Sequence, residues 1–185
     1  TPDFAVASLA SLADAGFEIA AVVTAADKPA GRGQKLSESA VKKYAVEKGL
    51  TVLQPLKLKD PEFITALKDL NADLHVVVAF RMLPEIVWNM PPKGTINLHG
   101  SLLPQYRGAA PINHAIINGE KESGVTTFFL KHEIDTGDII FSRSVSINEH
   151  DTAGDLHDKL MAVGAKLLTE TVQAIESGNY TEQPQ

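Results

Sequence analysis

A carboxamide and an imidazole stand two residues apart at the end of an apolar run, at Asn97 and His99 of the segment Gly94–His99. In an extended chain, residues i and i+2 point to the same face, which would place these side chains about 7 Å apart. A buried strand that carries two adjacent hydrogen-bonding groups incurs a desolvation cost unless those groups find partners. The spacing is therefore compatible with a catalytic strand end and equally with a pair of structural polar residues at a strand terminus.

Asp135 is the carboxylate that could complete this pair. It lies in the Gly-containing turn Asp135–Asp138, between two β-rich stretches. Loops of an open α/β sheet gather at the carboxyl ends of its strands, so we expect Asp135 beside Asn97 and His99. A carboxamide can donate to a developing oxyanion, and an imidazole near a carboxylate can stabilise or transfer charge. The three residues therefore predict a site that polarises a carbonyl while an external amine or water attacks it.

Other catalytic and binding motifs do not fit the sequence. Ser101 is close to His99, but no G-x-S-x-G turn surrounds it. Gly31-Arg-Gly33 lacks the third glycine of a dinucleotide fingerprint, and no G-x-x-x-x-G-K-[ST] motif occurs. The chain has no cysteine, and its six histidines show no metal-ligand spacing. We therefore predict neither serine-hydrolase chemistry nor a phosphate cradle, and no metal.

The elements that must position these groups alternate between helix and strand. Thr1 is expected to cap a first helix that has Pro2 at its first position. Periodicity and turn residues predict helices over residues 1–15, 38–48, 61–70 and 111–118, and strands over residues 17–24, 51–53, 73–80 and 94–99. Residues 27–36 are expected to be a loop. This alternation is typical of a parallel sheet covered by helices.

The last third of the chain has a different pattern. Two β-rich stretches, residues 124–131 and 138–147, are joined by a short connection that predicts an antiparallel pair. Thr152–Asp155 resembles a capping box, and an apolar stripe follows it at helical spacing: Leu156, Leu160, Val163, Leu167 and Val172. The predicted fold class is α/β, a doubly wound, mostly parallel sheet with an antiparallel strand pair near the C-terminal half.

Length and charge limit the possible classes of protein. The 185 residues suit one domain with a single core, and no 18-residue apolar run or secretory signal is visible. The formal net charge of −6 argues against broad nucleic-acid binding. A local basic patch exists at Lys28, Arg32 and Lys35, followed by Lys42 and Lys43. We expect no membrane association and a cytoplasmic location.

Both ends of the chain suggest an excised domain. A doubly wound sheet normally begins with a strand, whereas the first predicted element is a helix, so we expect a first strand to be missing before Thr1. The ending Tyr180–Gln185 is polar and contains a proline, as a linker does. We therefore expect a catalytic domain over residues 1–179 and the start of a linker over residues 180–185.

Several separated motifs, in the same order, resemble those of the folate-dependent formyltransferase family. They are Asn97-x-His99-x-Ser-Leu-Leu-Pro104, Arg107-Gly-x-Ala-Pro111 and Asp135-Thr-Gly-Asp138. The opening Thr1–Ala5 and the loop Pro29–Gly33 are similar to the branch that acts on methionyl-tRNA, rather than on glycinamide ribonucleotide or nucleotide sugars. The resemblance implies a Rossmann-like formyltransferase fold with an initial strand, whose absence would leave a central slot in the sheet unfilled. It also implies an OB-like C-terminal domain after the linker.

The resemblance also implies an activity, with roles for particular residues. A formyl group would pass from 10-formyltetrahydrofolate to the amino group of methionine on initiator tRNA, through a tetrahedral intermediate stabilised by Asn97, His99 and Asp135. Residues implied in folate binding are Arg81, Met82, Leu83, Ser101, Leu102, Leu103, Pro104 and Asp135. Residues implied in tRNA binding are Arg32, Lys28 and Lys35; the alternative for their loop is a solvated surface segment.

Two other functions stay open at this stage. The same chemistry could act on an amino-sugar nucleotide or a purine precursor, or the chain could be a folate- or RNA-binding module without catalysis. Neither a metal nor a membrane is implied as a partner, and a monomer is expected.

Overall fold

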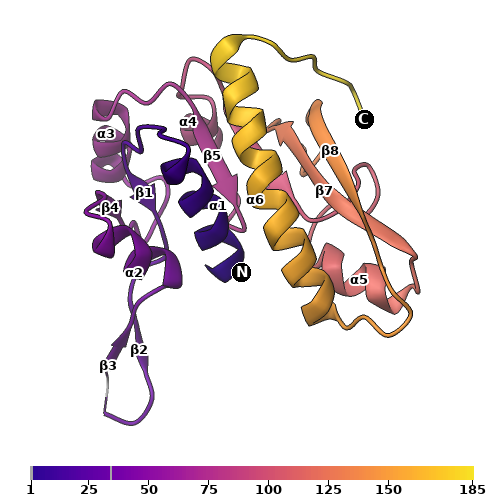
Figure 1. Ribbon diagram of the computed structural model, residues 1–185. Coiled ribbons are helices and arrows are strands. Elements are labelled where there is room, and N and C mark those ends of the chain that lie inside the picture. Colours follow the sequence, from indigo (N-terminus) through magenta and orange to yellow (C-terminus); the bar gives the residue numbers. More distant parts are fainter. Residues whose placement is uncertain (1, 34) are drawn as a thin grey trace.

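The computed structural model describes residues 2–33 and 35–185. The elements in chain order are α1 (Pro2–Asp14), β1 (Val22–Val23), β2 (Lys28–Ala30), β3 (Lys35–Ser37), α2 (Ala40–Glu47), β4 (Val52–Leu53), α3 (Pro61–Asp69), β5 (His75–Val78), α4 (Glu85–Trp88), β6 (Thr95–His99), α5 (Pro111–Ile117), β7 (Glu122–Phe129), β8 (Ile139–Ser146) and α6 (Ala153–Ser177) (Figure 1). The predicted cap residue Thr1 lies outside the described residues, as does residue 34 of the predicted tRNA loop.

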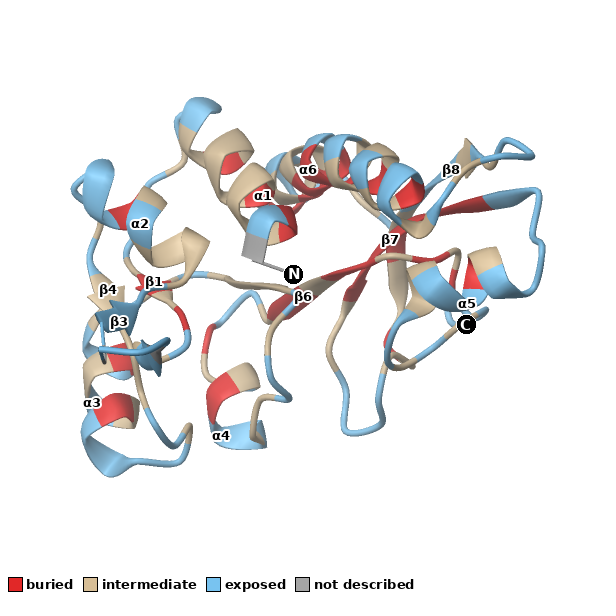
Figure 2. Ribbon diagram, turned by 90° about the horizontal axis from the view of Figure 1, so that it is seen from below, coloured by how far each residue is buried: buried red, intermediate tan, exposed pale blue. Residues whose placement is uncertain are grey.

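The main sheet has the strand order β5-β6-β7-β8. Strands β5 and β6 are parallel, whereas β7 runs antiparallel to both β6 and β8. A separate parallel pair is formed by β1 and β4. Helices α1 and α6 lie on one face of the sheet and α3 and α4 on the other (Figure 2). The α/β class and the antiparallel β7–β8 pair are thus confirmed.

Three local predictions were wrong. The segment 27–36, expected as a loop, belongs to an antiparallel hairpin in which β2 pairs with β3. The strand expected over residues 17–24 is confined to Val22–Val23, and helix α4 was not expected. Each of these elements has two to four residues. Elements that short contain too few residues to show a periodicity.

The core lies between the sheet and helix α6. Thr152 and Asp155 form the predicted capping box at the start of α6, and buried residues of its stripe, such as Leu156, Leu160 and Leu167, face the strands. Gly164 allows close contact with the sheet, because a Cβ atom there would lie 3.1 Å from a methyl carbon of Leu98. One face of β6 is therefore fixed against α6.

A cavity of about 680 Å³ lies between the two parallel units of the fold. It is lined mainly by residues 17–25 around β1 and residues 70–80 around β5, together with side chains of α1 and α6. Among the described residues, β1 and β5 pair with β4 and β6 and not with each other. Ser8, which also lines the cavity, has a buried hydroxyl with no hydrogen-bond partner in the described part of the chain.

Candidate active site

Strand β6 presents Asn97 and His99 on the face of the sheet opposite to α6. Ile96 and Leu98 alternate with them and belong to the core. The cross-strand partners of Asn97 and His99 on β7 are Phe128 and Thr126. The predicted projection of the two side chains is thus confirmed. Asn97 is half-buried, and its carboxamide makes no hydrogen bond to any described residue, so its N–H groups are available to a ligand.

His99 is buried, and both of its ring nitrogens face protein acceptors. Nε2 lies 2.8 Å from the carbonyl oxygen of Tyr106, and because a carbonyl can only accept, the proton is assigned to Nε2. Nδ1 lies 3.6 Å from Oδ2 of Asp135, which is an ion-pair distance but longer than a hydrogen bond. Residues 36 positions apart in the sequence therefore meet, as predicted, and an imidazolium would satisfy both contacts.

Asp135 is fixed by the two loops that surround it. Its carboxylate accepts the backbone N–H of Gly108 at 2.7 Å, and its own backbone has a φ of +54°, in the left-handed region. Gly137 brings this turn against β7: a Cβ atom there would lie 1.5 Å from the carbonyl oxygen of Phe129, so only glycine fits. The geometry of Asp135 thus depends on backbone contacts on both sides.

The turn after His99 is fastened to β7 by a buried threonine. The hydroxyl of Thr126 donates to the carbonyl of Ser101 at 2.6 Å and accepts the N–H of Leu103 at 3.1 Å. Ser101 donates its hydroxyl to the carbonyl of Gln105 and is buried, as is Leu103. Leu102 is half-buried and Pro104 is exposed. Ser101 and Leu103 therefore shape the turn, and Pro104 is the most accessible of the four residues of this turn that are implied in folate binding.

Arg81, Met82 and Leu83 follow β5 at the sheet edge that also carries His99, because Val78 pairs with Leu98 in parallel register. Arg81 donates to the carbonyls of Pro55 and Leu56, Met82 is exposed and Leu83 is half-buried. The backbone groups of residues 81–83 make no hydrogen bond within the described chain. They are therefore available to a ligand that carries paired donors and acceptors.

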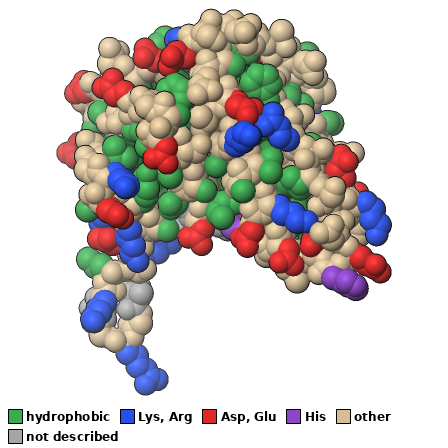
Figure 3. All heavy atoms as spheres, in the orientation of Figure 1, with side chains coloured by type: hydrophobic (Ala, Val, Ile, Leu, Met, Phe, Trp, Pro, Cys, Tyr) green, Lys and Arg blue, Asp and Glu red, His purple; other side chains and the backbone are tan. Residues whose placement is uncertain are grey.

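The hairpin of β2 and β3 carries the predicted basic residues. Lys28, Arg32 and Lys35 are all exposed, and the hairpin projects from the body of the molecule, where blue side chains gather on it (Figures 1 and 3). Its base is anchored by Asp27, whose carboxylate accepts from Lys42 at 2.6 Å and from Gln54 at 2.8 Å. The hydrogen bond from Lys42 holds the pKa of Asp27 below its ordinary value. Lys42 is therefore an anchor of the hairpin and not part of its free basic surface.

Sequence reasoning missed the backbone groups that hold the catalytic pair, which are the Tyr106 carbonyl and the Gly108 amide. Tyr106, Gly108 and Ala110 all have positive φ angles, of 56°, 87° and 54°. Of these three residues, only the glycine at 108 indicates such a conformation in the sequence. A glycine does not indicate that the backbone of this loop binds His99 and Asp135.

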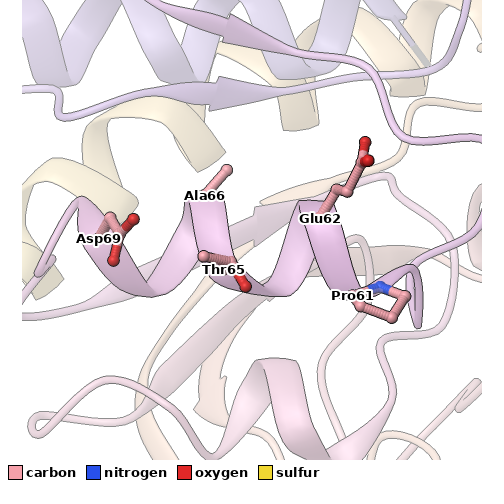
Figure 4. Close-up of a pocket in the computed structure, with 5 residues that line it drawn as sticks. All are labelled: Pro61, Glu62, Thr65, Ala66 and Asp69. Carbon is pink, nitrogen blue, oxygen red and sulfur yellow. The ribbon is translucent and has the colours of Figure 1, made fainter.

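Away from these loops, helix α3 carries a second concave region. A shallow hollow of about 440 Å³ is lined by Pro61, Glu62, Thr65, Ala66 and Asp69, all from helix α3 (Figure 4). Within residues 2–33 and 35–185, no three His, Cys, Asp or Glu side chains are grouped to hold a metal ion. No helix in the described ranges has both the length and the apolar character needed to cross a bilayer.

Comparison with protein families gives a match to formyl transferase over residues 1–172. Curated relatives include the methionyl-tRNA formyltransferase of Bacteroides fragilis, 58% identical over the whole chain, and that of Flavobacterium psychrophilum, 61% identical over 97% of it. The chain spans 57% of the length of each of these relatives.

Solved structures show a similar architecture. Phosphoribosylglycinamide formyltransferase from Anaplasma phagocytophilum is 26% identical with a TM-score of 0.81, over 93% of this chain and 82% of that one. A sugar 3N-formyl transferase, crystallised in the presence of dTDP and 5-N-formyl-THF, is 26% identical with a TM-score of 0.72, over 98% and 62%.

Proposed function

The chain belongs to the formyl transferase family, and on that premise we propose that it transfers a formyl group from 10-formyltetrahydrofolate to the α-amino group of methionine on initiator tRNA. The observation that carries this proposal is the meeting of His99 with Asp135, 3.6 Å apart, on the sheet face that also presents the unpaired carboxamide of Asn97. Such a set can stabilise charge on a carbonyl oxygen during attack by an amine.

From these contacts we infer a different task for each of the three side chains. Asn97 is the free donor, so its N–H groups would bind the formyl oxygen as negative charge develops there. The Nε2 proton of His99 is held by the Tyr106 carbonyl. The proton on Nδ1 is the one within reach of a substrate, because its contact with Asp135 is longer than a hydrogen bond. Asp135 would keep the imidazole oriented and compensate its charge while the proton of the amine moves to the departing folate nitrogen.

The formyl donor is inferred from the family and from the groups at the sheet edge. Two sugar formyltransferases of similar structure were crystallised with 5-N-formyl-THF or folinic acid. In this chain, the unpaired backbone groups of residues 81–83 suit a flat heterocycle with alternating donors and acceptors. We propose that Arg81, Met82 and Leu83 bind the pterin through backbone groups, and that Leu102 and Pro104 cover its other side on the turn that Ser101 and Leu103 support.

The acceptor is inferred from the relatives and from the basic hairpin. Relatives named methionyl-tRNA formyltransferase are 58–61% identical to the chain, whereas the glycinamide ribonucleotide and sugar enzymes of similar structure are 26% identical. The exposed Lys28, Arg32 and Lys35 can contact phosphates of an acceptor stem. We therefore favour tRNA over a small amine as the acceptor, in a cytoplasmic monomer.

The test is formyl transfer to charged initiator tRNA by the protein that carries this domain, with Asn97→Ala, His99→Ala and Asp135→Asn. Each variant should lower kcat at least about 100-fold, because each removes a group that acts on the developing charge. Asp135→Asn keeps the size of the side chain and an acceptor for the Gly108 N–H, so it tests the charge alone. Unchanged kcat in the His99 variant would refute its role.

A matched control separates chemistry from acceptor binding. Arg32→Ala should raise the KM for tRNA while kcat at saturation stays within about twofold, and it should weaken the salt dependence of binding. Faster formylation of an amino sugar or a ribonucleotide amine than of methionyl-tRNA would reject the proposed acceptor.

A further inference from the structure

The last residues of the chain fold back onto the candidate active site. Gln183 and Ile139 exchange two backbone hydrogen bonds, of 2.7 and 2.9 Å, at the start of β8. The ring of Tyr180 packs near that of Phe129, with 6.0 Å between their centroids. Residues 180–185, which have the composition of a linker, are therefore attached to the strand that follows the Asp135 turn.

The carboxamide of Gln185 joins the two loops that hold Asp135. Its Nε2 group donates to the carbonyl of Asp135 and to the carbonyl of Gly137, both at 2.8 Å. Its Oε1 atom accepts from Nε of Arg107 at 3.0 Å. Arg107 precedes Gly108, whose N–H binds the Asp135 carboxylate. One half-buried side chain thus connects the backbone of the aspartate to the loop that orients its carboxylate.

These contacts matter because the Asp135 turn is conformationally demanding. A non-glycine residue with a φ of +54° is less stable by about 1 kcal/mol or more than one in a right-handed conformation. Hydrogen bonds to the carbonyls of residues 135 and 137 restrict rotation of the 135–136 and 137–138 peptide units, which enclose Thr136 and Gly137. Without them, the turn can relax, and the Asp135 carboxylate would leave the position at which it faces both Gly108 and His99.

We propose that Gln185 is a positioning residue that acts through Asp135, so that the segment 180–185 is part of the catalytic apparatus. The inference rests on the proposed function for its kinetic consequence but not for its structural one. Gln185 bonds to Arg107 and to the Asp135 turn, and not to residues 81–83 or to the described residues of the basic hairpin, so it is expected to affect the turnover step and not the binding of either substrate.

The test compares Gln185→Ala and Gln185→Glu with the matched control Gln183→Ala in the protein that carries this domain. The side chain of Gln183 is exposed, and its backbone bridge to Ile139 does not need it. Glutamate at 185 keeps the acceptor for Arg107 but cannot donate to the two carbonyls. Both Gln185 variants should lower kcat about tenfold with KM values changed less than about twofold, whereas Gln183→Ala keeps the wild-type kcat. Wild-type kcat in either Gln185 variant overturns the proposal.

A second readout does not depend on activity. Hydrogen exchange of the Gly108 amide, resolved by NMR, should be about tenfold faster in both Gln185 variants than in Gln183→Ala, while the amide of Val125 in the core strand β7 keeps its protection. Equal exchange of Gly108 in all variants overturns the positioning role. If Gln185→Ala also speeds exchange of the Val125 amide, the fold itself is loosened in that variant, and the isosteric Gln185→Glu then decides whether Gln185 positions the Asp135 turn. If the wild-type protein shows no formyl transfer but the Gln185 variants still show faster exchange at Gly108, the proposed function is rejected and the positioning role is kept.

Discussion

His99 illustrates how backbone groups decide what a catalytic side chain can do. Its Nε2 proton is directed to the Tyr106 carbonyl at 2.8 Å, whereas Nδ1 has a longer contact with Asp135, at 3.6 Å. A proton held in a short, well-formed hydrogen bond is not free to move toward a substrate. The loop after β6 thus selects which of the two ring nitrogens faces the reaction, and the tautomer need not be set by the substrate.

A second histidine, His75 on β5, makes folding sensitive to acid. Burial holds its pKa below the ordinary value of 6.5, and the hydrogen bond to the backbone of Val87 partly offsets this effect. Below pH 6.5 the unfolded chain therefore binds a proton more readily than the folded chain does. The free energy of unfolding should fall as the pH drops through 6.5 and keep falling until the lower folded-state pKa is passed.

Urea unfolding near pH 7.5 and near pH 5.5 measures this effect. His75→Gln keeps a hydrogen-bond donor for Val87 but does not titrate, so its loss of stability between the two pH values should be smaller than that of the wild type. The exposed His150 provides the control, and His150→Gln should keep the wild-type difference. An identical pH dependence in wild type and His75→Gln would contradict the assignment.

Side chains of the site could be predicted from the sequence, and the groups that hold them could not. The two-residue spacing of Asn97 and His99 and the Gly-containing turn at Asp135 are local patterns with a direct geometric meaning. The Tyr106 carbonyl and the Gly108 amide are backbone groups that any residue has, and their directions depend on left-handed φ angles within the loop. The sequence therefore indicates which side chains can react, but not how the backbone orients them.

At the level of elements, the hairpin of β2 and β3 shows why short strands escape prediction. Its strands have three residues each, and Pro29, Gly31 and Gly33 favour a loop. The pairing is possible because Pro29 lies in a hairpin whose strands have only one neighbour each, where a missing N–H is tolerated. The anchor at Asp27 and Lys42 therefore supports the hairpin in addition to its own three-residue ladder.

Removing that anchor should loosen the hairpin. Lys42→Ala deletes the 2.6 Å contact with Asp27, and we expect trypsin cleavage after Arg32 and Lys35 to become about threefold faster, a modest effect because the ion pair is accessible to water. Limited proteolysis followed by mass spectrometry measures these cleavages. Lys43→Ala, an exposed neighbour that also removes one trypsin site, should leave them unchanged. Equal cleavage in the two variants would show that Gln54 alone suffices as the anchor.

At the level of the whole molecule, the parallel pair β1–β4 and the four-stranded sheet meet across a cavity instead of through a strand pairing. The order β5-β6-β7-β8 ends at β5, and β1 has only β4 beside it in the described part of the chain. The longer helices were predictable because each has an apolar face of sufficient length, as in α6. A missing first strand was expected from the order of the elements, but the slot that it would leave in the sheet was implied only by the family resemblance, because no local pattern reports which strands are neighbours.

This arrangement predicts an alternation of amide protection along the strands that border the cavity. The N–H groups of Val22 and Thr24 donate to β4, at 2.8 and 3.0 Å. In a parallel pair, successive N–H groups point to opposite sides, so the N–H of Val23 is directed toward the cavity. The same reasoning applies to His75, which donates to Gly94 at 3.2 Å, and to Val76 next to it. In a polypeptide of residues 1–185 alone, hydrogen exchange should be about tenfold or more faster at Val23 than at Val22, and at Val76 than at His75.

Strand β7 is the internal control for this measurement because it has a neighbour on each side. Val125 and Thr126 are fully buried there, and both of their amides should be protected. Alternation in β1 and β5 together with uniform protection in β7 would locate the exchange at the cavity and exclude general loosening of the sheet. If the amides of Val23 and Val76 were as protected as those of their neighbours, a hydrogen-bonding partner would have to lie between β1 and β5. An extended segment paired with both strands would supply carbonyl acceptors to the cavity-facing N–H groups of β1 and of β5 at once.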